Sequence, residues 1–340
     1  MRSAPSRLAW LFSAWLLGVY LLEATVAERT VPTLLLIYFV LPQCWLLPAV
    51  PLLAWSAWRR DRPALLASGA ALGLLGFQLP YTSKVSPTLR LMTYNIARGE
   101  GGAAAIAATV SAQRPDVVCL QETNTLEAGL MDDLLARLPD YTALRVREVA
   151  ILTRFPVLTH HRTALPGTSR ELLSAVLDVR GRPLSVLNAH FTTIPLRGGW
   201  RAARSSRAVQ LQSLLQAAQA LPASLAICGD FNTPPRGEVY AALKQRFGNA
   251  FEQAGTGFGY TFPAGFPLVW IDHVWLRGAA AVRAVVPSSR ASDHRPLAVD
   301  LSYGRALPAG TSGKGLDVPR LQQTPSLFLP LGLGQDGQRR

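Results

Sequence analysis

The sequence predicts an α/β protein in which two β-sheets pack face to face with helices outside them, behind a membrane-spanning N-terminal region. Between residues 88 and 302, short apolar runs alternate with segments of helical periodicity. Runs such as DVVCL and SLAIC are apolar on both faces, which is typical of strands covered on both sides. Strands dominate the later half and do not alternate strictly with helices, which favours two packed sheets over one doubly wound parallel sheet.

Three apolar segments lead the chain, at about 8–22, 31–58 and 63–80. The second is long enough to span a bilayer, and the third is near the lower limit and rich in small residues. The first is short for a span, and a signal peptide cleaved near Ala27 is its alternative. We therefore expect residues 1–87 to be a membrane region with two or three transmembrane helices.

Basic residues predict the orientation of this region. Arg2 and Arg7 precede the first segment, and RRDR at 59–62 lies between the second and third. The positive-inside rule then places the N-terminus and this loop in the cytoplasm. Either three spans or a cleaved signal peptide leaves residue 88 onward outside. The expected location is the cell membrane, as a multi-pass protein with an extracytoplasmic domain.

The elements of the large domain, residues 88–302, follow from their apolar patterns. Expected strands are 89–96, 116–122, 148–155, 172–179, 184–191, 224–231, 268–276 and 295–301. Expected helices are 101–113, 125–138 and 198–221. Residues 303–340, rich in Gly, Pro, Gln and Ser, are expected to form a disordered tail.

Polar residues that are unusual in buried strands gather at six strand ends. They are Asn95, Glu122, Asn188 with His190, Asp230 with Asn232, Asp272 with His273, and Asp293 with His294. One such end would be a cap or a turn. Six ends of this kind predict a functional site, because clustered charged and polar groups at the ends of buried strands are otherwise costly.

The residue types indicate the chemistry. Asn95, Glu122 and Asp293 offer hard oxygen ligands, and no cysteine has a ligand spacing, which favours Mg²⁺ or Mn²⁺ over zinc. His190 and His294 can hold or move protons near neutral pH. This inventory suits phosphate-ester hydrolysis better than acyl transfer, which would need an activated serine or cysteine.

The motifs TYNI, LQE, ILTRFP, NAHF, GDFNTPP, YTFP, IDHVWL and SDHRPLAV occur in this order between residues 88 and 302. In this order they resemble the endonuclease/exonuclease/phosphatase superfamily, which includes proteins similar to pancreatic deoxyribonuclease, and the chain looks like a membrane-anchored, bacterial-type member. The resemblance implies a four-layer α-β-β-α sandwich.

The resemblance also implies roles for single residues. Glu122 resembles the principal metal-binding carboxylate and Asn95 its neighbouring ligand, with Asp293 near the metal. His190 resembles the histidine that hydrogen-bonds the phosphoryl oxygen or the leaving group. The carboxylate that pairs with this histidine in the nucleases has no assigned position in this sequence.

For the remaining strand ends, Asp230 and Asn232 resemble the pair that positions the nucleophilic water and the phosphate. Asp272 resembles the acid that orients His294, which would be the general base or a stabiliser of the transition state. Members of the superfamily differ on whether the aspartate or the histidine takes the proton, so this choice stays open. Arg170 is expected to contact the substrate phosphate, with a surface arginine as the alternative.

The predicted function is a membrane-anchored, divalent-metal-dependent phosphoester hydrolase of phosphodiesterase or nuclease type. Basic residues outnumber acidic ones, 34 to 21, which suits a phosphate-bearing partner without requiring nucleic acid. Expected partners are a phosphate ester (nucleic acid, nucleotide or lipid headgroup) and the membrane, and no protein partner is indicated. The alternatives are a lipid-headgroup or phosphoinositide-type phosphatase resembling sphingomyelinases, and a non-catalytic binding protein on the same fold.

Overall fold

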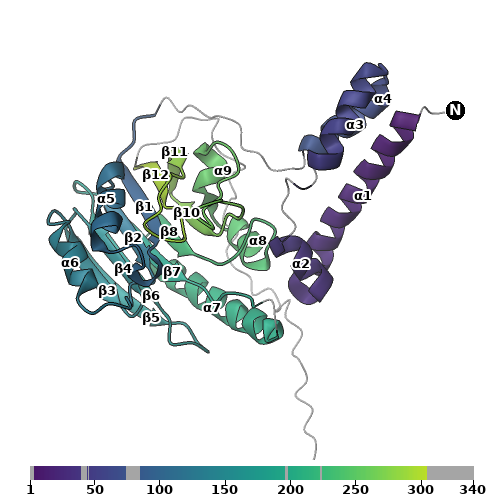
Figure 1. Cartoon of the computed structure of the whole chain (residues 1–340). Coiled ribbons are helices and arrows are strands. Elements are labelled where there is room, and N and C mark those ends of the chain that lie inside the picture. Colours follow the sequence, from purple (N-terminus) through teal and green to yellow (C-terminus); the bar gives the residue numbers. More distant parts are fainter. Residues whose placement is uncertain are drawn as a thin grey trace, which may run out of the picture. The chain divides into compact units, whose positions relative to one another are not determined.

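Figure 1 shows the computed structural model, which describes residues 4–39, 44, 46–73, 85–195, 198–222 and 224–304. The N-terminal part is helical. Its elements are α1 (Ala4–Val26), the 3-10 turn η1 (Ala27–Arg29), α2 (Val31–Phe39), α3 (Leu46–Trp58) and α4 (Arg62–Gly73). The predicted disordered tail lies, from residue 305 on, outside the described residues.

Within the described residues, one helix, Arg7–Arg29, is long and apolar enough to cross a membrane, so the expectation of two or three membrane-spanning helices is not supported there. The segment 31–58, expected to span, contains the separate helices α2 and α3. Pro48 lies in the first turn of α3, where a missing backbone N–H is tolerated, so that helix begins there. Its 13 residues reach only about 20 Å, against a hydrocarbon core of about 30 Å. The segment 63–80 is helical as far as Gly73, and residues 74–80 lie outside the described residues.

The first sheet has six strands in the order β11-β12-β1-β2-β4-β3. Their bounds are β1 (Leu89–Asn95), β2 (Val117–Gln121), β3 (Thr142–Val146), β4 (Val149–Thr153), β11 (Ala279–Val285) and β12 (Leu297–Tyr303). Within it, β1 and β2 pair in parallel and the other neighbours pair antiparallel.

The second sheet also has six strands, in the order β5-β6-β7-β8-β10-β9. Their bounds are β5 (Val157–Ala164), β6 (Glu171–Asp178), β7 (Pro183–His190), β8 (Leu225–Asp230), β9 (Gly248–Asn249) and β10 (Asp272–Arg277). Its parallel pair is β7 and β8. Each sheet is therefore mixed, with one parallel pair among antiparallel neighbours.

Helices accompany both sheets, as Figure 1 shows for α5 and α6 on one side and α7 on another. Their bounds are η3 (Ala97–Gly99), α5 (Ala103–Gln113), α6 (Leu130–Ala136), α7 (Trp200–Ala220), α8 (Glu238–Lys244) and α9 (Ala250–Ala254). Helix α5 connects the parallel strands β1 and β2, and α7 connects β7 and β8.

Three apolar clusters define the layers. Cys119 of β2 and Cys228 of β8 belong to the cluster between the sheets. Leu120, the next residue of β2, packs with side chains of α5 and α6, and Ile227 packs with side chains of α7 and α8. Because neighbouring strand residues point to opposite faces, both central strands are buried on both sides, as their sequences predicted. The layer order is helices, sheet, sheet, helices, and the predicted four-layer sandwich is confirmed.

A buried amide contact joins the two sheets just below their strand ends. Gln121 of β2 donates through Nε2 to Oδ1 of Asn188 of β7, at 2.7 Å. The Asn188 amide then donates to the carbonyl oxygens of Leu120 and Ala150, each at 2.8 Å. Satisfied polar groups in a low-dielectric core stabilise one relative placement of the elements that they join. The amide pair therefore fixes the end of β2 against the end of β7.

Candidate active site

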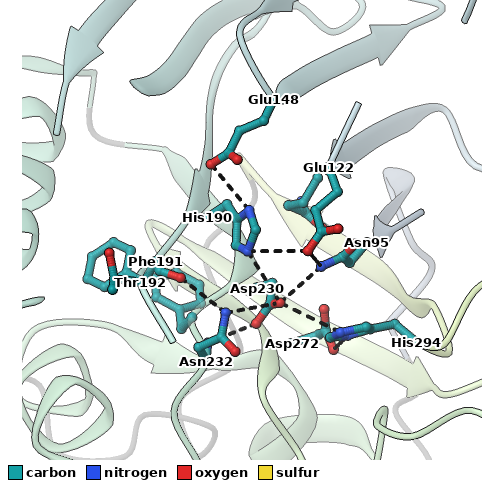
Figure 2. Close-up of polar contacts among 12 residues, drawn as sticks. Asn95, Glu122, Glu148, His190, Phe191, Thr192, Asp230, Asn232, Asp272 and His294 are labelled. Atoms are coloured by element: carbon teal, nitrogen blue, oxygen red, sulfur yellow. Dashed lines mark hydrogen bonds and ion pairs between the residues drawn. The ribbon is translucent and has the colours of Figure 1, made fainter. Parts of the chain in front are cut away.

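The candidate site lies where the ends of strands from both sheets meet (Figure 2). Asn95 ends β1 beside the parallel strand β2, which directly precedes Glu122. His190 and Asp230 face each other at the ends of the parallel strands β7 and β8. Strand β10 runs antiparallel to β8, and its first residue, Asp272, also lies opposite Asp230. Ligand sites of α/β proteins commonly form at the carboxyl ends of such parallel strands.

The backbone at these strand ends is unusual. Glu122 and Asn232 adopt φ values of 55° and 46°, in the left-handed region that residues other than glycine rarely occupy. Such conformations gather at functional sites, where surrounding contacts hold them. Gly229 has a φ of 151°, and a Cβ atom there would collide with the carbonyl oxygen of Ala189. Only glycine lets β8 approach β7 this closely just before Asp230.

Asn95 links the first sheet to the second. Its Nδ2 atom lies 3.1 Å from Oε1 of Glu122 and 3.1 Å from Oδ2 of Asp230. Its Oδ1 accepts the backbone N–H of Ala97 at 3.0 Å, which fixes the amide. Two carboxylate oxygens from different sheets therefore converge on one point.

Asp230 is the centre of the cluster. Its Oδ1 accepts the backbone N–H of Asn232 at 2.8 Å, and its Oδ2 lies 3.3 Å from the Asn232 amide nitrogen. The same Oδ2 lies 3.7 Å from Nε2 of His190 and 3.7 Å from Nε2 of His294. Asn232 is itself held by a 3.0 Å bond to the carbonyl oxygen of Phe191.

His294 is oriented by Asp272. Its Nδ1 lies 2.8 Å from Oδ2 of Asp272, so Nε2 faces Asp230. Burial alone would lower the pKa of this imidazole, but the charges of Asp272 and Asp230 and the hydrogen bond outweigh burial and raise the pKa to about 10. In this environment His294 is an imidazolium at neutral pH and acts as a donor.

Glu148 is a member of this cluster that the sequence analysis missed. Its Oε1 lies 3.3 Å from Nδ1 of His190, an ion-pair contact without aligned hydrogen-bond geometry, and 3.1 Å from Nε of Arg170. Burial would raise the pKa of this carboxyl, but the contact with His190 and the charges of His190 and Arg170 lower it. Glu148 is therefore the carboxylate partner of His190 that had no assigned position.

The position of Glu148 explains why no sequence signal found it. It directly precedes β4, so it lies at the start of a strand, whereas the polar residues singled out lie mostly at strand ends. Because β4 runs antiparallel to β2, with Val149 opposite Gln121, the start of β4 lies beside the end of β2. The available signal was a carboxylate immediately before a fully buried strand.

Arg170 and Asp293 have contacts that differ from those of the central residues. Arg170 donates through Nη1 to the carbonyl oxygens of His190 and Phe191, at 3.3 and 2.6 Å, besides its contact with Glu148. Asp293 is exposed, and Oδ1 of its carboxylate lies 3.3 Å from Oγ of Ser292. A phosphate contact by Arg170 stays a prediction, and the exposure of Asp293 weighs against the metal ligation that its motif implies.

His273 lies outside this cluster, as expected from its opposite direction along β10. It is fully buried, and its Nε2 lies 2.8 Å from the carbonyl oxygen of Thr233. Burial lowers its pKa to about 4, so the ring is neutral at physiological pH. It is a structural residue beneath the loop that follows Asp230.

The donor set fits a divalent cation. Glu122 and Asp230 converge on the Asn95 amide, and within the described part of the chain Oδ1 of Asp272 is buried without a hydrogen-bond partner. Atoms of Asp230, Asp272 and His294 also lie within 4.8 Å of one another. Because Mg²⁺ and Mn²⁺ prefer oxygen ligands, we favour the set around Glu122 and Asn95 over one that contains His294.

Two sheets whose joined ends hold carboxylates, an amide pair and two carboxylate-bound histidines place the protein in the class of phosphoester hydrolases. The model of the Endonuclease/Exonuclease/phosphatase family matches residues 92–294. The chain belongs to this family, and the predicted resemblance is confirmed. No curated protein matches the sequence.

Solved structures share the fold at low sequence identity. An endonuclease/exonuclease/phosphatase from Bacteroides vulgatus is 18% identical with a TM-score of 0.55, covering 63% of this chain and 98% of its own. A mannosyl-6-phosphatase from Bacteroides thetaiotaomicron is 19% identical with a TM-score of 0.54, covering 63% and 100%. The catalytic domain of human Nocturnin is 22% identical with a TM-score of 0.52, covering 65% and 96%.

Proposed function

We propose that the protein is a divalent-metal-dependent phosphoester hydrolase of phosphodiesterase or nuclease type, anchored in the membrane by α1. The observation that carries the proposal is the position of Asp230, whose Oδ2 lies within 3.7 Å of both histidines and 3.1 Å from the amide that joins it to Glu122. A water molecule beside this oxygen would lose its proton to Asp230. The two histidines beside it would donate hydrogen bonds to the phosphate.

The residues divide the reaction between them. Asp230 accepts the proton of the attacking water, because His294, with its pKa raised to about 10, is already protonated. The water oxygen forms a bond to phosphorus while the bond from phosphorus to the leaving oxygen breaks. His294 and His190 donate through Nε2 to the negative charge that develops on the phosphoryl and leaving oxygens. Asn232 orients Asp230 and the phosphate.

Glu122 and Asn95 would hold the metal, which we expect to be Mg²⁺ or Mn²⁺. When bound, such an ion supplies positive charge to the phosphoryl oxygens. Glu148 and Asp272 each hold Nδ1 of one histidine, which directs Nε2 of both rings toward Asp230. The protein thus prepares the donors before substrate binds.

A lipid headgroup is the second candidate substrate. The carboxylate of Glu28, at the end of the apolar helix, accepts the backbone N–H of Glu238 at 2.8 Å. Glu238 lies six residues after Asn232, so the end of the helix contacts the segment that follows the candidate site. A phosphate ester at a membrane surface would therefore lie near the site.

The orientation that we propose places the site on the outer side of the membrane. Arg2 precedes the apolar helix and Arg7 begins it, which favours a cytoplasmic N-terminus. One crossing leaves the following residues outside, and RRDR at 59–62 then also lies outside instead of in the cytoplasm as expected from its charge. Alkaline phosphatase fused after residue 302 should be active in a bacterial host. An inactive fusion together with a fluorescent cytosolic reporter at the same position would contradict this orientation.

The activity is tested on the full chain, purified in detergent or lipid nanodiscs. DNA, RNA, sphingomyelin, inositol phosphates and bis(4-nitrophenyl) phosphate are each incubated with Mg²⁺ or with EDTA. We expect hydrolysis of at least one phosphate ester with Mg²⁺ and none with EDTA. Binding of a phosphate ester without turnover would support a non-catalytic binding protein on the same fold.

A further inference from the structure

Arg207 of α7 is a buried arginine outside the cluster described above, with 1% of its surface exposed. Its Nη1 donates to the carbonyl oxygen of Thr192 at 2.6 Å and to that of Phe231 at 3.1 Å. Thr192 follows His190 by two residues, and Phe231 follows Asp230 by one. One guanidinium therefore joins the two chain segments that leave the ends of β7 and β8.

A second side chain of α7 strengthens this contact. Gln210 accepts the backbone N–H of Thr192 at 3.1 Å and donates to its hydroxyl at 2.7 Å. Asn232 completes the connection through its bond to the carbonyl oxygen of Phe191. The positions of His190, Asp230 and Asn232 relative to one another thus depend on contacts that radiate from one face of α7.

The same guanidinium meets the N-terminal helices. Its Nη2 donates to the hydroxyl of Tyr38 in α2, at 3.4 Å, and that hydroxyl donates to Oε1 of Glu28, at 3.0 Å. Glu28 is 1% exposed. A buried guanidinium needs a counter-charge, because an unpaired charge in the protein interior is strongly destabilising. Glu28 is the carboxylate that supplies it across the Tyr38 hydroxyl.

Further contacts surround this polar chain, all within the compact unit of residues 1–304. Arg236 pairs with Glu23 and donates to the carbonyl oxygen of Leu36, at 3.1 Å, in the last turn of α2. The Tyr38 hydroxyl lies 3.5 Å from Oγ1 of Thr233, the residue after Asn232. An apolar cluster closes the contact and consists of Leu34, Ile194 and Ala203, with Tyr38 and Trp200 packed against them.

We propose that Arg207 is a positioning residue for the candidate active site, and that residues 23–38 complete it by supplying the counter-charge of Glu28. The last residues of the candidate membrane span, Arg7–Arg29, and the helix that follows it are then a part of the catalytic unit. The kinetic test of this inference rests on the proposed function, because it needs a wild-type chain that hydrolyses a phosphate ester. It concerns residues that touch neither the metal site nor the reacting phosphate.

The test compares three variants of the full chain in nanodiscs. Arg207→Met keeps the length of the side chain and removes its charge and donors, and Glu28→Gln keeps the shape and an acceptor oxygen. Arg204→Met is the matched control, because Arg204 lies one turn earlier on α7 and forms a partly exposed ion pair with Glu238. The substrate is whichever phosphate ester the wild-type chain hydrolyses with Mg²⁺.

We expect Arg207→Met and Glu28→Gln each to lower kcat by about ten-fold or more while KM changes by less than about two-fold, because displaced catalytic groups lower the rate more than substrate binding. The double variant should resemble Arg207→Met alone, since both residues act through one connection. Arg204→Met should stay within about two-fold of wild type. A role in stability alone would lower the melting temperature of Glu28→Gln and leave kcat unchanged, which would overturn the proposal.

Hydrogen exchange gives a readout that needs no activity and no Arg207 variant. In Glu28→Gln, we expect faster exchange in peptides covering residues 190–195 and 230–238 than in wild type. Faster exchange confined to residues 23–38 would overturn the proposal. A wild-type chain without metal-dependent hydrolysis would instead contradict the proposed function, and the exchange experiment would still decide whether Glu28 acts on the strand ends.

Discussion

The two sheets are built on the same plan, each with a central parallel pair joined by a crossover helix. In the first sheet the ends of this pair present Asn95 and Glu122, an amide and a carboxylate suited to a metal ion. In the second sheet they present His190 and Asp230, which suit proton transfer. The same topology therefore serves two chemical tasks, because the carboxyl ends of both parallel pairs reach one place.

The sheets differ in how their ends are held. In the first sheet a neutral contact holds the backbone at the strand end, where Oγ of Ser292 donates to the carbonyl oxygen of Asn95 at 2.7 Å. Charged groups hold the second, where Arg170 and Arg207 donate to the carbonyl oxygens that follow His190 and Asp230. Charge-assisted bonds are stronger than neutral ones and lose more when one partner is removed. Substitutions at the strand ends of the second sheet should therefore lower the turnover rate. Substitutions at the strand ends of the first sheet should raise the Mg²⁺ concentration needed for activity.

The largest effect is expected for Asp230→Asn in the second sheet. The variant keeps the size of the side chain and the oxygen that accepts the N–H of Asn232, but it removes the charge that takes the proton. Turnover should fall by about two orders of magnitude or more at nearly unchanged melting temperature. His294→Ala should have a similar effect, and the double variant should be far from additive if both serve one step.

The opposite result for Asp230 would identify a structural residue. A capping or turn aspartate contributes roughly 0.5–2 kcal/mol of stability and no catalysis. Turnover and melting temperature are therefore measured on the same preparation of Asp230→Asn. An active variant with a lowered melting temperature would show that this strand end serves the fold alone.

Glu122→Gln tests the first sheet. Loss of the carboxylate should raise the Mg²⁺ concentration needed for half-maximal activity by about 10–100-fold, the size of effect seen when contacts of a metal site are lost. Activity at saturating Mg²⁺ should recover in large part. A titration of Mg²⁺ against initial rate measures both quantities, and an unchanged half-saturation point would remove Glu122 from the metal site.

Glu148→Gln tests the contact that joins the sheets through His190. We expect kcat to fall by about ten-fold, because the histidine loses the group that orients it. Since the folded-state pKa of Glu148 is lowered, its contribution to stability is present above the ordinary glutamate range and is lost as the pH falls through the folded pKa. Melting temperatures in EDTA should differ between variant and wild type near pH 7 and converge under acidic conditions. A constant difference across this range would contradict the assigned ion pair.

Asp293→Asn should have the smallest effect. Its side chain is exposed, and charges in water interact weakly with their surroundings. We expect activity and Mg²⁺ requirement within about two-fold of wild type. A rise in Mg²⁺ requirement like that of Glu122→Gln would show that Asp293 is the metal ligand that its motif implies.

The sequence alone predicts the central strands and their polar end residues, because the burial of a strand and the point where it ends are encoded in its own residues. Runs apolar on both faces identified the central strands, and polar residues that interrupt them identified Asn95, Glu122, His190 and Asp230, which the structure brings together. The edge strands β3, β5, β9 and β11 and the short helices α8 and α9 were missed. The edge strands β3 and β5 are largely exposed, so they lack the apolar pattern of a covered strand. Strand β11 has only two buried residues.

Tertiary structure alone decided which residues support that cluster. Glu148 starts a strand, and only the antiparallel register of β4 on β2 brings it to His190. Arg207 has the sequence context of an ordinary solvated helix face, yet the contact with Tyr38 and Glu28, about 170 residues earlier, makes it a buried charge. A local pattern determines whether a residue is buried or a strand ends. Pairing and docking join segments far apart in the chain, and their geometry appears only when the whole chain has folded.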